Sequence, residues 1–130
     1  MHMNNDTDID NTEFEIKFFE SVLKKVPDYM EVIEILGCLY TDIGQIDDGL
    51  RMDMKAVKLM PWNPTSHYNL ACSQALKGQT VKAIESLKKS IELGYDDLEW
   101  MLEDDDLLSL HGHTKFEELV KKLDKMLNQK

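Results

Sequence analysis

The sequence predicts an all-α fold, a helical solenoid in which about seven helices stack as antiparallel pairs. Three observations predict it: the segment from Met30 to Asn63 recurs 34 residues later, apolar residues are spaced three and four apart, and glycine or proline stands at the helix ends. Such a period indicates a helix-turn-helix unit stacked on its copy, because neither copy can bury its hydrophobic face alone. The recurring pairs are Leu36 with Leu70, Gly37 with Ala71, Gly44 with Gly78, Gly49 with Ala83, Leu50 with Ile84, and Leu59 with Leu93.

The apolar stripes place the helices in order along the chain. The predicted helices span residues 13–25, 27 or 28 to 43, 46–59, 64–77, 80–93, 96–103 and 114–127. Gly44 and Gly78 suit the left-handed conformation that ends many helices, and Pro64 and Thr80 suit helix starts. The last helix has an acidic first turn and lysines near its end, which complements the helix dipole. We expect this helix to cap the stack and screen its last apolar face.

The residues that carry the period resemble the tetratricopeptide repeat, whose pattern runs W-x2-L-G-x2-Y, then a small residue, then a closing proline. The first copy matches it at Leu36-Gly37-x2-Tyr40, Gly49, Ala56 and Pro61. The second copy matches it at His67-x2-Leu70-Ala71, Gly78, Ala83 and Ser90. The departures are Ile33 for the leading tryptophan, Gln74 for the tyrosine, Tyr95 for the closing proline, and Asp53 where the family places a large apolar side chain.

The resemblance, to a small bacterial-type member of the family, implies a division of the chain. Residues 1–12 are Asn- and Asp-rich and are expected to form a disordered tail before a single domain over residues 13–130. Within that domain we expect a half repeat at 13–27, repeat one at 30–63, repeat two at 64–97, and a degenerate terminal unit with its capping helix at 98–130. The resemblance also implies a right-handed superhelix.

By the same resemblance, the first helix of each repeat lines a concave face. We expect this face to bind an extended peptide or a helix of a partner protein, with Asn69 bonding main chain and Tyr68 and Leu76 giving apolar contact. The alternative is that these residues only solvate a structural stack. A chaperone-tail clamp is disfavoured, because only Asn69 of its lysine and asparagine set is present. The predicted lining residues are Glu31, Glu34, Cys38, Thr41, Asp42, Thr65, Tyr68, Asn69, Cys72 and Leu76.

A second function class remains open, a self-assembling scaffold that forms homo-oligomers through its convex back. Trp62 follows the closing Pro61, so it either packs over the next helix, which we favour, or protrudes as an anchor. Three methionines, Met52, Met54 and Met60, lie nearby in the sequence. Exposure of Tyr68, Cys72 and Leu76 together would favour the adaptor, whereas exposure of Trp62 and the methionines would favour self-assembly.

The net charge bears on the partner. The 25 acidic and 15 basic residues leave a formal charge of -10, which disfavours nucleic acid as a partner and favours a neutral or basic protein. An acidic excess also has a simpler reading as a source of solubility. No run approaches the roughly 18 apolar residues of a membrane span, and no secretory signal is recognisable, so we expect a cytoplasmic protein without membrane attachment.

Cofactor and catalytic chemistry find little support. Cys38 and Cys72 lie one period apart, where neighbouring helices are too distant for a disulfide, so both are expected to be free and buried thiols rather than redox or metal ligands. The acidic run from Asp96 to Asp106 with nearby His111 and His113 could hold a divalent ion, but its spacing matches no metal motif. We expect no cofactor, no metal and no enzymatic activity, because phosphate-binding and hydrolase motifs are missing from the sequence.

Overall fold

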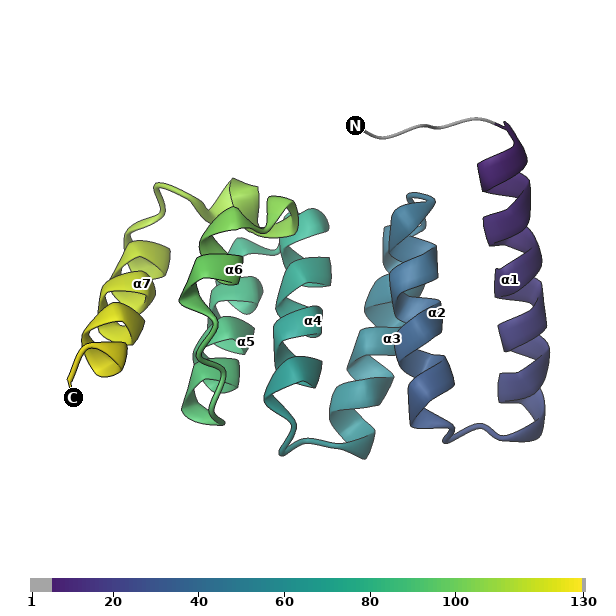
Figure 1. The fold of residues 1–130 in the computed structure, drawn as a ribbon, viewed down its shortest axis with the longest axis horizontal. Coiled ribbons are helices and arrows are strands. Elements are labelled where there is room, and N and C mark those ends of the chain that lie inside the picture. The colour runs from purple at the N-terminus through teal and green to yellow at the C-terminus, as the bar shows by residue number, and fades with distance from the viewer. Residues whose placement is uncertain (1–5, 130) are drawn as a thin grey trace. The chain divides into compact units, whose positions relative to one another are not determined.

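The computed structural model describes residues 6–129 and contains helices and no strand within that range (Figure 1). The all-α prediction is confirmed. The helices are α1 (Asp6–Lys25), α2 (Met30–Asp42), α3 (Ile46–Leu59), α4 (Pro64–Leu76), α5 (Thr80–Glu92), α6 (Leu98–Glu103), the 3-10 helix η1 (Asp105–Leu110), and α7 (Thr114–Leu127). None of them is long and apolar enough to cross a membrane.

The first helix is longer than expected. It begins at Asp6, so residues 6–12 are helical and the disordered tail predicted over 1–12 is wrong for this part, while residues 1–5 lie outside the described residues. This stretch has no periodic set of apolar positions, but adding a residue to an existing helix gains a hydrogen bond at small entropic cost.

The chain divides into two compact units, one ending at Leu59 and one beginning at Met60. In the N-terminal unit, α2 packs against both α1 and α3, around Ile16, Ile33 and Leu36. In the C-terminal unit, α4 packs against α5 and η1, and the core continues through Leu87 and Met101 to the cap α7. The buried hydrophobic residues form two clusters, each inside one unit. In the segment between α3 and α4, residues 60–63, each side chain is exposed or partly buried, and that of Trp62 is exposed.

Each repeat closes its first helix in the same way. Gly44 and Gly78 both have φ of 83°, a left-handed conformation that glycine adopts without a Cβ clash, as the sequence predicted. In both turns the next backbone amide donates back to a helix carbonyl at 2.8 Å, Gln45 to Tyr40 and Gln79 to Gln74. Identical turns explain why the period holds over the two copies.

The two repeats fill the crossing of their helices differently. A Cβ added to Gly37 on α2 would lie 2.9 Å from an Oδ atom of Asp53 on α3, so the glycine makes room for this buried carboxylate. In repeat two the equivalent positions hold Ala71 and Leu87, both fully buried. The departure at Asp53 is thus accommodated by a smaller residue on the facing helix.

The start of α4 is fixed by polar contacts to the preceding loop and to α5. Asn63 caps the helix by accepting from the Thr65 amide at 2.9 Å. The buried His67 donates from Nε2 to the Pro61 carbonyl at 2.8 Å, and the fully buried Ser90 donates to the Pro64 carbonyl at 2.7 Å. His67 is therefore a buried histidine that packs and fixes the start of α4.

Candidate protein-interaction surfaces

The chain itself covers the predicted binding face of α4. The 3-10 helix η1 packs against α4 and buries Leu107 and Leu110 completely. Beneath this segment Tyr68 is only 5% exposed and Cys72 is also buried. The prediction that these two side chains contact a partner protein is therefore wrong. Leu108, which lies between these two leucines in η1, is exposed.

A polar network fastens this cover. The Tyr68 hydroxyl donates to Oδ2 of Asp104 at 2.7 Å, and the Cys72 thiol lies 3.6 Å from the same oxygen. The other oxygen of Asp104 accepts from the Asp106 amide at 3.0 Å and so caps η1. Tyr95, which stands in the place of the closing proline, stacks on Tyr68 with ring centroids 4.5 Å apart. These residues connect α4, the loop after α5 and η1 into one closed face.

The tyrosine hydroxyls of the network are held in their neutral form. Burial is the main cause that raises the pKa of Tyr68, and the hydrogen bond to Asp104 adds to it. Burial also raises the pKa of Tyr95 to about 12, although its contact with the Tyr68 hydroxyl acts in the opposite direction. Neutral phenols are suited to donating hydrogen bonds, which is the role of Tyr68 here.

The same network contains the one grouping of metal-ligand types found among the described residues. Ligand atoms of Cys72, Asp104 and Asp106 lie within 4.8 Å of one another. Their hydrogen bonds already account for the Asp104 carboxylate, which caps η1 and accepts from Tyr68. A capping and clamping role is sufficient for this arrangement.

The two histidines considered as metal ligands have structural roles. His111 stacks on Phe116 with ring centroids 5.3 Å apart, and Nδ1 of His113 accepts from the Lys115 amide at 3.2 Å. His113 is therefore the N-terminal cap of α7. The two rings are thus engaged in separate contacts.

The rest of the predicted lining on α4 differs in accessibility. Thr65 and Leu76 are exposed and Asn69 is partly buried. Leu76 lies beside a shallow depression formed with Ala75 and residues of η1, including Leu108. The available surface of α4 is thus a margin around η1 rather than an open face.

The equivalent face of α2, in the N-terminal unit, is open. Glu31, Cys38 and Asp42 are exposed, while Glu34 and Thr41 are partly buried. The Thr41 hydroxyl donates to the Gly37 carbonyl at 3.0 Å, so it is engaged within its own helix. Cys38 is exposed, as its place in the predicted lining requires, whereas the expectation that both thiols are buried holds for Cys72 and is wrong for Cys38.

Sequence reasoning also missed Ile35, which lies on the same side of α2. It is 40% exposed and stands between Glu31 and Cys38 in the helical order. Ile35 lies one 34-residue period before Asn69, a polar residue of the predicted lining on α4. Comparing the two positions could have identified Ile35 as a lining residue of α2. We call Glu31, Glu34, Ile35, Cys38 and Asp42 the α2 face.

The surface considered for self-assembly is partly exposed. Trp62 is 65% exposed and Met54 is exposed, whereas Met52 is buried and Met60 is partly buried. The favoured expectation that Trp62 packs over the next helix is therefore wrong, because the ring protrudes from the loop. An exposed indole is a large apolar contact surface without a partner inside the described residues.

Solved structures of one protein resemble this chain. A crystal structure of MamA matches with a TM-score of 0.70 at 24% identity, over 97% of this chain and 76% of that one. The structure titled MamA MSR-1 C2 has a TM-score of 0.66 at 17% identity, over 90% of this chain and 70% of that one. A third, MamA RS-1 ArsTM double mutant, has a TM-score of 0.66 at 18% identity, over 95% and 72%.

The fold is of the tetratricopeptide type. The likeness to MamA, a protein with tetratricopeptide-like repeats, and the repeated helix pairs with identical glycine turns agree on this point. No protein-family model and no curated protein sequence matches the chain. At these identities the structural likeness establishes the fold and leaves function to the residues themselves.

Proposed function

We propose that this chain is a non-enzymatic scaffold that binds a segment of another protein on its α2 face. The observation that carries the proposal is the contrast between the two repeats. On α4 a short leucine-bearing helix of the same chain occupies the face that α2 leaves exposed. A first helix in this fold can therefore be covered by one or two turns of an amphipathic segment, and α2 offers the same type of surface.

The side chains of the α2 face indicate the chemistry of its ligand. Where α4 has Tyr68 and Leu76, α2 has Glu34 and Asp42, so the open face is more acidic than the covered one. Ile35 and the Cys38 thiol supply a small apolar strip between these carboxylates. A segment with basic residues around an aliphatic side chain would complement it, since opposite charges favour encounter and apolar contact slows release.

Cys38 permits a direct test of this site. In a Cys72→Ser background, a photoreactive crosslinker attached to Cys38 should capture a partner protein in native extract. Glu34→Lys/Asp42→Lys should abolish this capture. Glu85→Lys/Glu92→Lys, which makes the same charge change on exposed residues of α5, should leave it intact. Equal capture by the two double variants would contradict a role for the α2 face.

Self-assembly is the second candidate function. Part of the exposure comparison favours it, because Trp62 and Met54 are exposed while Tyr68 and Cys72 are covered. Met52 is buried and Leu76 is exposed, and these two residues do not follow this pattern. The indole of Trp62 is a large side chain of a type that is enriched at protein interfaces. Self-association that is lost in Trp62→Ala would support this candidate.

A further inference from the structure

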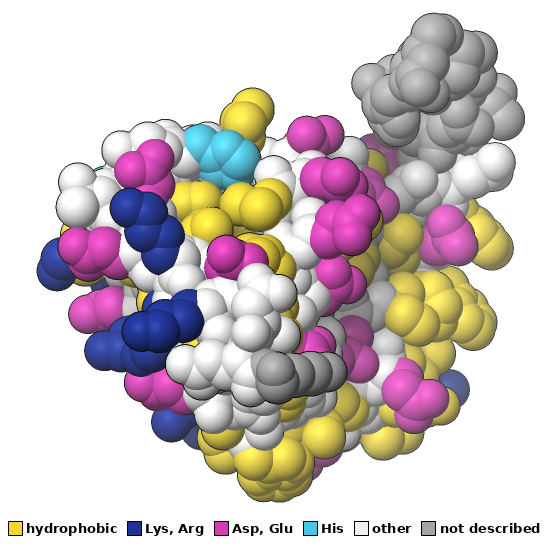
Figure 2. Space-filling model, turned by 60° about the vertical axis from the view of Figure 1, so that its left-hand side comes forward, with side chains coloured by type: hydrophobic (Ala, Val, Ile, Leu, Met, Phe, Trp, Pro, Cys, Tyr) yellow, Lys and Arg dark blue, Asp and Glu magenta, His cyan; other side chains and the backbone are white. Residues whose placement is uncertain are grey.

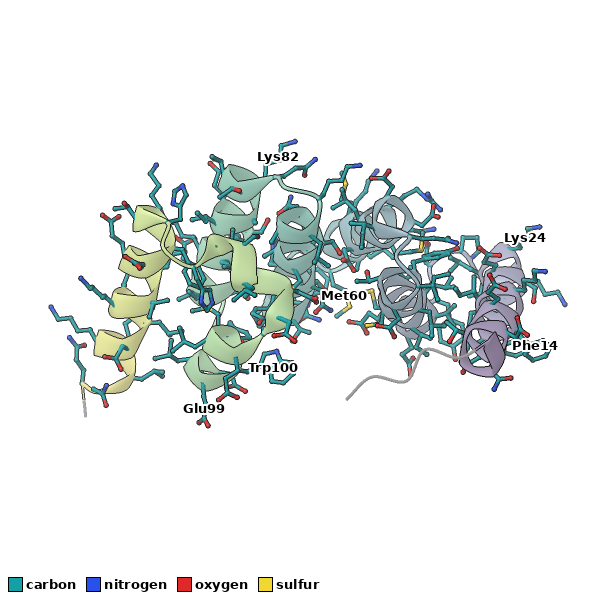
Figure 3. All side chains as sticks on the ribbon, turned by 90° about the horizontal axis from the view of Figure 1, so that it is seen from above. Phe14, Lys24, Met60, Lys82, Glu99 and Trp100 are labelled. Atoms are coloured by element: carbon teal, nitrogen blue, oxygen red, sulfur yellow. The ribbon has the colours of Figure 1, made fainter. Side chains whose placement is uncertain are left out.

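The short helix α6 presents an apolar side chain among carboxylates. Trp100 is 56% exposed, and Figure 3 shows it projecting from α6 together with Glu99. Asp97 caps the helix by accepting from the Trp100 amide at 3.0 Å, and Glu103 follows Trp100 by nearly one turn. The segment from Asp96 to Asp106 contains seven acidic residues and no basic one. We call Asp97, Glu99, Trp100 and Glu103 the α6 surface.

The N-terminal unit contains a cleft of opposite character. It has a volume of about 590 Å³ and lies where α1 and α3 flank α2. Its apolar floor includes Leu36 and Met52, and its rim carries Lys17, Lys24 and Arg51. Figure 3 shows Lys24 projecting outward from α1. We call this the basic cleft.

The basic cleft concentrates scarce positive charge. Residues 6–59 contain thirteen acidic and six basic side chains, and three of the six line this cleft. The one acidic residue of the lining, Glu20, already accepts a hydrogen bond from the Tyr40 hydroxyl. Arg51 is paired with Asp48 on its own helix at 2.6 Å, at an exposed site where such a pair is weak and exchangeable. The rim can therefore receive carboxylates from outside.

A second lysine-bearing cleft in the chain is less suitable for an acidic ligand. It lies between α5 and α7 and has Lys88, Lys115 and Lys122 on its walls. Glu85 and Glu118 line the same cleft, so positive charge alternates with negative. Figure 2 shows a similar mixture of dark blue and magenta side chains over the face that it presents. This cleft serves below as a matched control.

We propose that the α6 surface of one copy docks into the basic cleft of a second copy of this chain. Trp100 would cover the apolar floor, while Glu99 and Glu103 would meet the lysines of the rim. Charge complementarity identifies the occupant, because this acidic chain carries both the basic cleft and the acidic aromatic surface that fits it. The two surfaces differ, so the contact is heterologous and each copy keeps one surface free for the next. The α2 face is not used, so this proposal stands apart from partner binding there.

Sedimentation over a concentration series tests the proposal. Wild-type protein should increase in mean mass beyond two copies as concentration rises. Trp100→Ala and Lys17→Glu/Lys24→Glu should each weaken association roughly 30-fold or more, as expected for a central aromatic anchor and its charged partners. Trp62→Ala and Lys88→Glu/Lys122→Glu should behave as wild type. All substituted residues are exposed, and circular dichroism checks that each variant remains helical.

Mixing provides the decisive arm. Trp100→Ala keeps an intact basic cleft, and Lys17→Glu/Lys24→Glu keeps an intact α6 surface, so an equimolar mixture should form dimers and nothing larger. Raising the salt to about 1 M should weaken association, because the screening length falls to about 3 Å. The proposal is overturned if wild type stays monomeric at every concentration, if Trp62→Ala rather than Trp100→Ala removes association, or if the mixture does not pair.

Discussion

Alanine at position 49 should destabilise the N-terminal unit, although alanine is the better helix former. A Cβ added to Gly49 would lie 2.6 Å from Oγ1 of Thr41 and 3.2 Å from the Gly37 carbonyl oxygen. Relieving the first contact means rotating Thr41, which breaks its hydrogen bond to the Gly37 carbonyl. The second contact involves backbone and yields only if α2 and α3 move apart. The side chain is therefore introduced at a crossing that has no room for it.

The magnitude follows from opposing terms. Replacing glycine by alanine within a helix gains about 1 kcal/mol of propensity. Overpacking a close contact costs about 1 to 3 kcal/mol, and the lost hydrogen bond costs about 1 kcal/mol. Gly49→Ala should thus lower the free energy of unfolding by about 1 to 3 kcal/mol. With an m-value near 2 kcal/mol per molar urea, the midpoint should fall by about 0.5 to 1.5 M.

The second repeat supplies the matched control. There Ala83 occupies the position of Gly49 and Ala75 that of Thr41, and both alanines are buried. Adding Thr41→Ala to Gly49→Ala copies this arrangement and should return the urea midpoint to the wild-type value or above. A double-mutant cycle should show a coupling of about 1 to 2 kcal/mol between the two sites. A single variant as stable as wild type, or a double variant no better than the single one, would refute the reasoning.

Three further predictions concern the C-terminal unit. Ser66→Ala should raise the urea midpoint, because its buried hydroxyl finds no hydrogen-bond partner among the described residues. Ser90→Ala should lower the midpoint, because it removes a buried hydrogen bond to the Pro64 carbonyl. Each variant should change the free energy of unfolding by about 1 kcal/mol. Leu107→Ala should lower the free energy of unfolding by about 2 to 5 kcal/mol. In a background that lacks the exposed Cys38, it should also speed the modification of Cys72 by a thiol reagent, and an unchanged rate would show that η1 does not protect Cys72. The neutral Tyr95 phenol has its pKa raised from 10.0 to about 12, so its stabilising contribution is complete below about pH 10 and is lost as the pH rises through 12; phenolate absorbance and urea midpoints at alkaline pH check this.

The sequence predicted those parts of the fold that depend on neighbours along the chain. Helix ends at Gly44 and Gly78 and the start at Pro64 follow from local conformational preference, and the structure has them at these positions. The start of α1 was placed too late, because apolar periodicity marks only the part of a helix that packs. Helix propagation beyond that part leaves no such mark.

The candidate site was harder to predict, since its accessibility depends on contacts between distant residues. Tyr68 and Asp104 are 36 residues apart, and their bond decides whether the α4 face is open. The sequence prediction treated the first helices of the two repeats as equivalent. It therefore placed Tyr68 on an open surface, like Glu34 at the equivalent position of repeat one. The available clue was Tyr95, whose replacement of the closing proline provides the ring that stacks on Tyr68. The period itself carries no information about the segment that follows it.

The division into two hydrophobic clusters has a consequence for how this protein can evolve. Because each cluster lies within one unit, a substitution that repacks the N-terminal core leaves the interior of the C-terminal unit unchanged. The basic cleft and the α2 face belong to one unit, and the α6 surface belongs to the other. Selection can therefore alter the receptor surfaces and the docking surface separately, and each change draws on the stability of one half of the chain only.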